Sequence, residues 1–103
     1  MELKGYQRKY LRSIAHNLKP SVYVGKNDIT EGVFKSINDS FNTNELIKIK
    51  LFTSGNKKIK SQIISDKIQC NIVGIIGKIL IAYKENKDPE LRKIILPNKW
   101  KEK

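Results

Sequence analysis

Two apolar runs on either side of Gly77-Lys78 constrain the fold of this chain most strongly. The runs, residues 70–76 and 78–84, are rich in β-branched side chains, which favour strands. A short break that contains glycine between two such runs is typical of a β-hairpin. We therefore expect a central hairpin, and with it a sheet that the rest of the chain extends and covers.

The residues before this hairpin alternate between helical and strand patterns. Ile47, Ile49 and Leu51 alternate with lysines, as in a strand with one apolar face. Apolar residues before Pro20 instead recur at helical spacing, until the proline ends the helix. Together the patterns predict helices at 3–18, 29–42 and 57–68, strands at 21–24, 45–52, 70–76 and 78–84, and a short edge strand at 94–96.

The order of these elements, α-β-α-β-α-β-β, predicts an α+β fold. A chain of 103 residues is long enough for one domain with its own core. We expect a single-domain open sandwich, in which a four-stranded mixed sheet has helices packed on it. Cys70, Tyr23 and Tyr83 lie in apolar strand contexts and are expected in the core.

The charge of the chain is strongly unbalanced. It has 21 Lys+Arg against 10 Asp+Glu, a net charge of +11. Such an excess favours a polyanionic partner, with nucleic acid ahead of an anionic membrane surface. A compositional bias of the source toward lysine and isoleucine would explain part of the excess, although such a bias does not by itself suppress Asp and Glu.

Several classes of function are disfavoured by the same composition. The single cysteine excludes an internal disulfide and a Cys-rich zinc site, and the single histidine excludes a multi-histidine site. Neither a nucleophile nor an orienting partner lies near His16 in the sequence, so a role as general base is disfavoured. The N-terminus has no secretory apolar segment, and no apolar run reaches the ~18 residues of a spanning helix. We expect a cytoplasmic protein with no catalytic activity, metal or cofactor.

One candidate site for an anion is the loop Gly25-Lys26-Asn27-Asp28, between a predicted strand and a predicted helix. Exposed amides at a helix N-terminus favour anions, and Lys26 adds a positive charge. On spacing alone an ordinary strand-to-helix turn is the favoured explanation of the loop. Asp28 and Glu31 also have the spacing of a capping box, with Thr30 as a competing cap.

Further candidates lie on the first helix and on the strand at 45–52. Arginine forks grip phosphate with two hydrogen bonds, whereas surface lysines are more often solvated. Lys57, Lys58 and Lys60 are interpreted mainly as a solvated helix face. The candidate RNA contacts outside the loop are Arg8, Lys9, Arg12, His16, Lys19, Lys48 and Lys50.

Five blocks of the chain resemble one known family. They are Leu11-Arg12-Ser13-Ile14-Ala15-His16-Asn17-Leu18-Lys19-Pro20, the loop from Val24 to Glu31, Glu45-Leu46-Ile47-Lys48-Ile49-Lys50, the hairpin from Val73 to Lys84, and Ile95-Leu96-Pro97. In this order they resemble the signatures of the CRM domain family, the YhbY-like proteins. The resemblance covers about residues 3–97, and implies a CRM-like domain at 1–97 followed by a basic tail at 98–103.

This resemblance carries expectations about fold and function. It implies a fold related to the C-terminal domain of translation initiation factor 3, RNA binding, and no enzymatic activity or cofactor. Stand-alone bacterial members associate with precursors of the large ribosomal subunit and assist assembly. The family loop reads Gly-x-x-Gly, and Asp28 replaces the second glycine here. We expect this aspartate to cap the second helix and to weaken a phosphate contact through its charge.

The sequence therefore predicts a non-catalytic, monomeric protein that binds ribosomal RNA or large-subunit precursors. A module that docks on acidic ribosomal or assembly proteins is the alternative, because the same basic surface would serve it. Membrane binding ranks last, since the apolar stripes are needed for the core. Weak dimerisation through the hairpin edge remains open.

Overall fold

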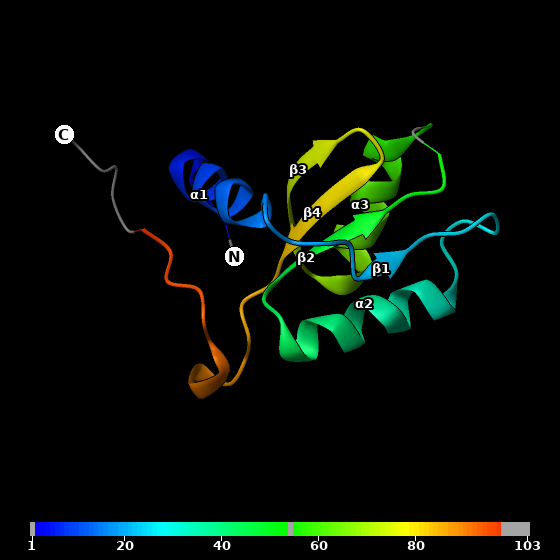
Figure 1. Ribbon diagram of the computed structural model, residues 1–103. Helices are drawn as coiled ribbons and strands as arrows, with labels where there is room; N and C mark the ends of the chain where they lie inside the picture. The colour runs from blue at the N-terminus through cyan, green and yellow to red at the C-terminus, as the bar shows by residue number, and fades with distance from the viewer. Residues whose placement is uncertain (1, 54, 98–103) are drawn as a thin grey trace.

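The computed structural model describes residues 2–53 and 55–97, and the basic tail predicted at 98–103 lies outside them. The chain forms three α-helices and a four-stranded sheet, as predicted (Figure 1). In chain order the elements are α1 (Gly5–Ala15), β1 (Val22–Tyr23), α2 (Glu31–Thr43), β2 (Leu46–Lys50), α3 (Lys57–Ile68), β3 (Asn71–Ile76), β4 (Ile79–Tyr83) and the 3-10 turn η1 (Pro89–Leu91).

The sheet is mixed and has the strand order β1-β2-β4-β3. β1 and β2 run parallel, while β4 is antiparallel to both of its neighbours, β2 and β3. The predicted hairpin is formed by β3 and β4, and its turn uses Gly77 at φ 57°, a conformation that glycine adopts without strain. A register shift between Ile72 and Gly74 leaves Val73 without a partner on β4.

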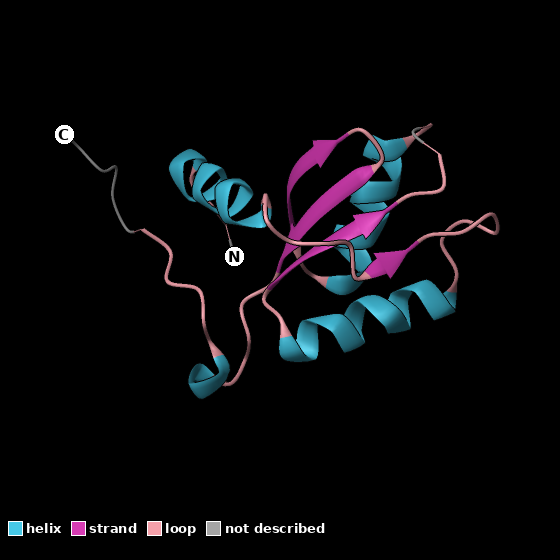
Figure 2. Cartoon of the chain, in the orientation of Figure 1, coloured by secondary structure: helices cyan, strands magenta, loops and turns pink. Residues whose placement is uncertain are grey.

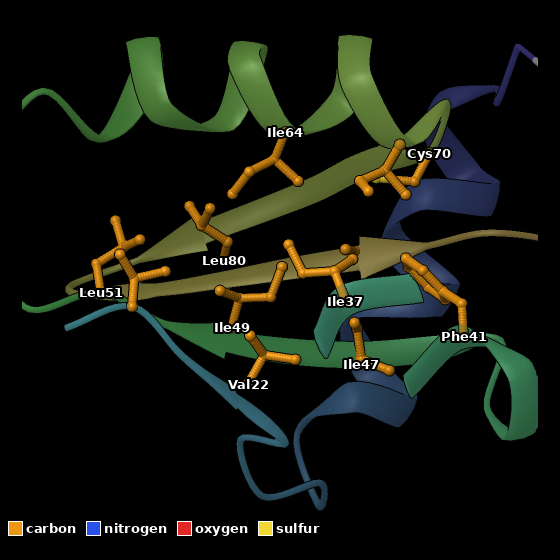
Figure 3. Packing of buried hydrophobic residues seen from close by; sticks show 12 residues of the cluster. Val22, Ile37, Phe41, Ile47, Ile49, Leu51, Ile64, Cys70 and Leu80 are labelled. Carbon is orange, nitrogen blue, oxygen red and sulfur yellow. The ribbon is translucent and has the colours of Figure 1, made fainter. Parts of the chain in front are cut away.

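Helices cover both faces of the sheet (Figure 2). α2 and α3 pack on one face, where alternate strand residues and the apolar stripes of both helices form the larger core. Figure 3 shows Ile37 of α2 and Ile64 of α3 lying around Ile49 and Leu80 of the sheet. The Cys70 side chain belongs to this cluster, which confirms its predicted place in the core.

The second face of the sheet is covered by α1 and by the segment that follows β4. Leu11 and Ala15 are fully buried against strand residues that include Ile81 and Tyr83. The edge strand predicted at 94–96 is wrong, because these residues form no strand. The buried carboxylate of Glu45 instead accepts hydrogen bonds from the backbone amides of Lys93, at 2.8 Å, and Ile94, at 3.0 Å, which fixes this segment as a loop against the α1 side.

Most element boundaries lie inside the predicted ones, and only α3 coincides with its prediction. α1 spans Gly5–Ala15 rather than 3–18, and β1 has only two residues.

The predicted capping role of Asp28 is wrong. Thr30 caps α2 through its hydroxyl, which accepts a hydrogen bond from the Val33 amide at 3.3 Å. Asp28 lies outside the helix at φ 65°, a left-handed conformation.

Candidate nucleic-acid interface

Three connections of the fold meet at one end of the sheet, on the right in Figure 1. Because β1 and β2 are parallel and β4 is antiparallel to them, the segments after β1 and β2 lie beside the β3–β4 turn. A hydrogen bond from the Leu51 amide to the Lys78 carbonyl, 2.7 Å long, ties two of these connections together. We call this surface the loop end and define it as residues 25–30, 50–53, 55–56 and 77–78, together with the first turn of α3.

The Gly25–Asp28 segment forms a tight turn at the loop end. The Asp28 amide donates to the Gly25 carbonyl at 3.0 Å. Gly25 is exposed, its φ lies outside the left-handed region, and a Cβ added to it would meet nothing within 4 Å. The fold itself therefore does not require glycine here. The bare backbone allows an external group to approach the turn closely.

The lysines of the loop end fall into two groups. Lys60 lies 3.5 Å from the Asp28 carboxylate, and Lys57 donates to the Gly77 carbonyl at 3.3 Å. The second group is exposed, and its ammonium groups make no hydrogen bond or ion pair within residues 2–53 and 55–97; its members are Lys26, Lys50, Lys58 and Lys78. An anion at the loop end would meet several ammonium groups that the fold leaves uncommitted.

The arginines of α1, which the sequence names as candidate phosphate contacts, also bind the sheet. The Arg8 guanidinium donates to the Ile72 carbonyl at 2.8 Å, and the Arg12 guanidinium donates to the Val73 carbonyl at 2.9 Å. The aliphatic part of Arg12 lies over Gly74, where an added Cβ would be only 2.8 Å from its Cδ. Both arginines thus hold the outer edge of β3, and each keeps further N–H groups for other partners.

The remaining candidates lie between these two regions. Lys48 is half-buried and donates to the Leu18 carbonyl at 2.9 Å, so it fixes the segment between α1 and β1. Lys9, His16 and Lys19 are exposed on or just after α1. The structure therefore groups the loop residues Gly25–Asp28 with Lys50, and it separates them from the α1 candidates.

The sequence comparisons match this chain to a known family. The model of the CRS1 / YhbY (CRM) domain matches residues 3–84. This chain belongs to the CRM domain family. It is 35% identical over 96 residues to an "RNA-binding protein" of Haemophilus influenzae, covering 90% of this chain and 93% of that protein. It is 33% identical over 91 residues to the "Probable RNA-binding protein PA4753" of Pseudomonas aeruginosa, covering 86% and 88%.

A solved structure agrees with this assignment. The solution structure of a hypothetical protein from Staphylococcus aureus, described there as a candidate RNA-binding protein, superimposes with a TM-score of 0.80. The two are 34% identical, and the match covers 93% of this chain and 100% of that one. The match confirms the predicted α+β fold at the level of the whole domain.

The sequence analysis of this CRM domain did not select Lys58 or Lys78 as candidate contacts. Lys78 lies in the predicted hairpin turn, so its exposure could be anticipated. Its position at the same end of the sheet as Lys26 depends on the strand directions, and no local pattern gives these. Tyr23 was expected in the core, but its side chain is 64% exposed.

Two buried titratable groups of this CRM domain, the Cys70 thiol and the Tyr83 phenol, are held in their neutral forms at neutral pH. Burial raises the pKa of the Cys70 thiol to about 11. Burial, together with the nearby charges of Glu45 and Glu85, raises the pKa of Tyr83 to about 12. Neither group is therefore an activated nucleophile. Among residues 2–53 and 55–97, no cluster of His, Cys, Asp or Glu could hold a metal ion, and no helix is long and apolar enough to cross a bilayer.

Proposed function

We propose that this CRM domain is a non-catalytic RNA-binding protein whose loop end contacts the phosphate backbone. The observation that carries the proposal is the open Gly25 turn at an end of the sheet that also carries uncommitted lysines. Backbone amides and lysines together favour phosphate oxygens. Most of the affinity for RNA then comes from charge, and the affinity should fall as the salt concentration rises.

We further propose that the target is ribosomal RNA in precursors of the large subunit, in the cytoplasm, where the domain acts as a monomer and assists assembly. The support for this target is the resemblance of five sequence blocks to YhbY-like proteins. The net charge of +11 suits a large polyanion of this kind.

The direct test measures binding to a structured RNA fragment by fluorescence anisotropy at several salt concentrations. The slope of log affinity against log salt should be about −0.7 to −0.9 per phosphate neutralised. The double substitution Lys26→Glu with Lys58→Glu should lower affinity and flatten the slope. The matched control reverses two exposed lysines far from the loop end, Lys87→Glu with Lys93→Glu. Equal losses of RNA affinity in the two double variants would show that only net charge matters, and would contradict a site at the loop end.

The cellular test fractionates a lysate on a sucrose gradient with and without RNase. Sedimentation with large subunits or their precursors that is lost after RNase supports the proposed target. Sedimentation that survives RNase would instead support docking on an acidic protein, and it would overturn the RNA proposal.

A further inference from the structure

One row of side chains crosses all four strands beside the loop end. Tyr23 of β1 is in register with Lys50 of β2, Lys50 with Ile79 of β4, and Ile79 with Ile76 of β3. Residues paired in this way point to the same face of a sheet. With strands about 4.8 Å apart, the row is about 14 Å long. We call these side chains the open row: Tyr23, Lys50, Ile79 and Ile76.

The open row lies on the α1 face of the sheet, at the margin of the cluster that α1 buries, and only Ile79 packs against that cluster. The cluster buried under α1 includes Leu46, Ile81 and Tyr83, which lie nearer the opposite end of the same strands. Figure 1 shows α1 over that opposite end only. Tyr23 is 64% exposed and Ile76 is 62% exposed, so both ends of the row are uncovered apolar side chains, while Ile79 between them is half-buried.

The chemistry of the row restricts what can cover it. Tyr23 and the two isoleucines offer a flat apolar surface, whereas Lys50 and the adjacent lysines of the loop end require negative charge. An unpaired nucleotide supplies both features, since its base has an apolar face and its phosphate is anionic. Stacking of a base on an exposed aromatic ring is a common mode of RNA recognition.

We infer that the open row binds an unpaired base of the RNA, with Tyr23 stacked on the base and Lys50 near its phosphate. The inference rests on the proposed function and adds to it a preference for RNA that has an unpaired nucleotide. The loop end would hold the phosphate backbone of a helix, and the open row would take a nucleotide bulged out of that helix. Recognition of this kind selects RNA with bulges or internal loops over perfect duplex.

The test compares three RNA probes of equal length by fluorescence anisotropy. The first is a perfect duplex, the second carries one unpaired nucleotide, and the third carries an abasic ribose at that position with the same phosphates. A stacked base should favour the second probe over the third by about 5- to 150-fold. Tyr23→Ala should reduce this ratio to about one, whereas Tyr23→Phe should keep it, because the ring remains.

The control variants separate this inference from the proposed function. Ile95→Ala removes an 85% exposed apolar side chain from the segment after η1, which runs on the left of Figure 1, away from the loop end, and should leave the ratio unchanged. Lys26→Glu should weaken all three probes alike. If every probe binds and the ratio is one, the inference about the open row is wrong, while phosphate binding at the loop end still holds. If none of the three probes binds, the proposed function itself is wrong. The row would instead belong to a protein partner if the ratio is one, if the domain binds a protein after RNase treatment, and if Tyr23→Ala abolishes that protein binding.

Discussion

Two basic regions of this domain use their charges in opposite ways. On the α1 side, Arg8 and Arg12 donate to β3 carbonyls, and Lys48 donates to the Leu18 carbonyl. At the loop end, Lys26 and Lys58 are exposed and make no such bonds within the described residues. The α1 side uses its cations to hold the fold together, whereas the loop end leaves its cations available for a partner.

This difference also explains how an open sheet edge is protected. β3 is an edge strand, and an unpaired edge invites pairing with another chain. Arg8 and Arg12 occupy two of its outward carbonyls where the register shift leaves Val73 unpaired. The residues with the most specific phosphate-binding chemistry in the sequence are thus engaged at an edge. This lowers the tendency to dimerise through the hairpin.

The largest effect on stability is expected at Glu45, which anchors the C-terminal segment on the α1 side. Its carboxylate is 5% exposed and accepts from the amides of Asn86, Lys93 and Ile94. Glu45→Ala leaves these amides without an acceptor and should cost about 2–4 kcal/mol in the free energy of unfolding. Urea denaturation measures this loss of stability. The exposed Glu85→Ala should cost about 0.5 kcal/mol or less.

Glu45 also gives stability a defined dependence on acid. Burial raises its pKa, but the backbone hydrogen bonds from Asn86, Ile94 and Lys93 outweigh burial and hold the pKa below the ordinary 4.5. A carboxyl whose pKa is lowered by folding stabilises the fold above pH 4.5, and that contribution is lost as the pH falls through its folded pKa. Glu45→Ala should remove this part of the acid dependence. An unchanged profile would contradict the anchor.

The second prediction concerns the arginines themselves. Arg8→Ala with Arg12→Ala should cost about 2–3 kcal/mol of stability and promote self-association through β3. Lys26→Ala with Lys58→Ala should change stability by about 0.5 kcal/mol or less. Urea denaturation and size-exclusion chromatography measure both. If the double variant Arg8→Ala with Arg12→Ala kept its stability and lost RNA affinity, the α1 side rather than the loop end would be the region that binds RNA.

These two predictions depend on contacts that the sequence could not reveal. The period of apolar residues located α3 correctly, and the glycine break located the β3–β4 hairpin, because both patterns are local. The partners of Arg8 and Arg12 are 64 and 61 residues away. A charge reversal at Arg12, which looks harmless on a solvated helix face, would therefore also disturb the fold.

The failures of prediction have the same origin. Ile94 and Leu96 have strand-like side chains, but the Glu45 carboxylate captures the amides that a strand would use. Tyr23 has the residue type of a core position, but α1 stops short of its end of the sheet. The place of the Gly25–Asp28 loop between β1 and α2 could be predicted from the sequence, whereas the lysines that share the loop end with it required the strand directions.

The third prediction compares two open glycines. An added Cβ meets nothing within 4 Å at Gly25 or at Gly5, so alanine at either position should leave the fold intact. Gly25→Ala should lower RNA affinity about tenfold, because the methyl group keeps phosphate away from the turn. Gly5→Ala, in the first turn of α1, should leave RNA affinity unchanged. Equal affinities for the two variants would show that the Gly25 backbone does not contact RNA.

The smallest effect is expected at Asp28, the one carboxylate within the Gly25–Asp28 turn. Its φ of 65° suits glycine and asparagine at least as well, and its ion pair with Lys60 is 55% exposed on the aspartate side. Asp28→Gly and Asp28→Asn should therefore each change stability by about 0.5 kcal/mol or less. Both remove a negative charge near the bound phosphate, which should tighten RNA binding about threefold at low salt.

The pair of Asp28 variants separates charge from backbone shape. Equal gains in anisotropy titrations would mean that the carboxylate acts only through its charge, and that it releases Lys60 for the RNA when removed. A gain in Asp28→Gly alone would mean that the side chain blocks a close approach of phosphate to the turn. If neither variant tightened binding, phosphate would not reach this side of the loop, and the contact would lie between Lys26 and the open row.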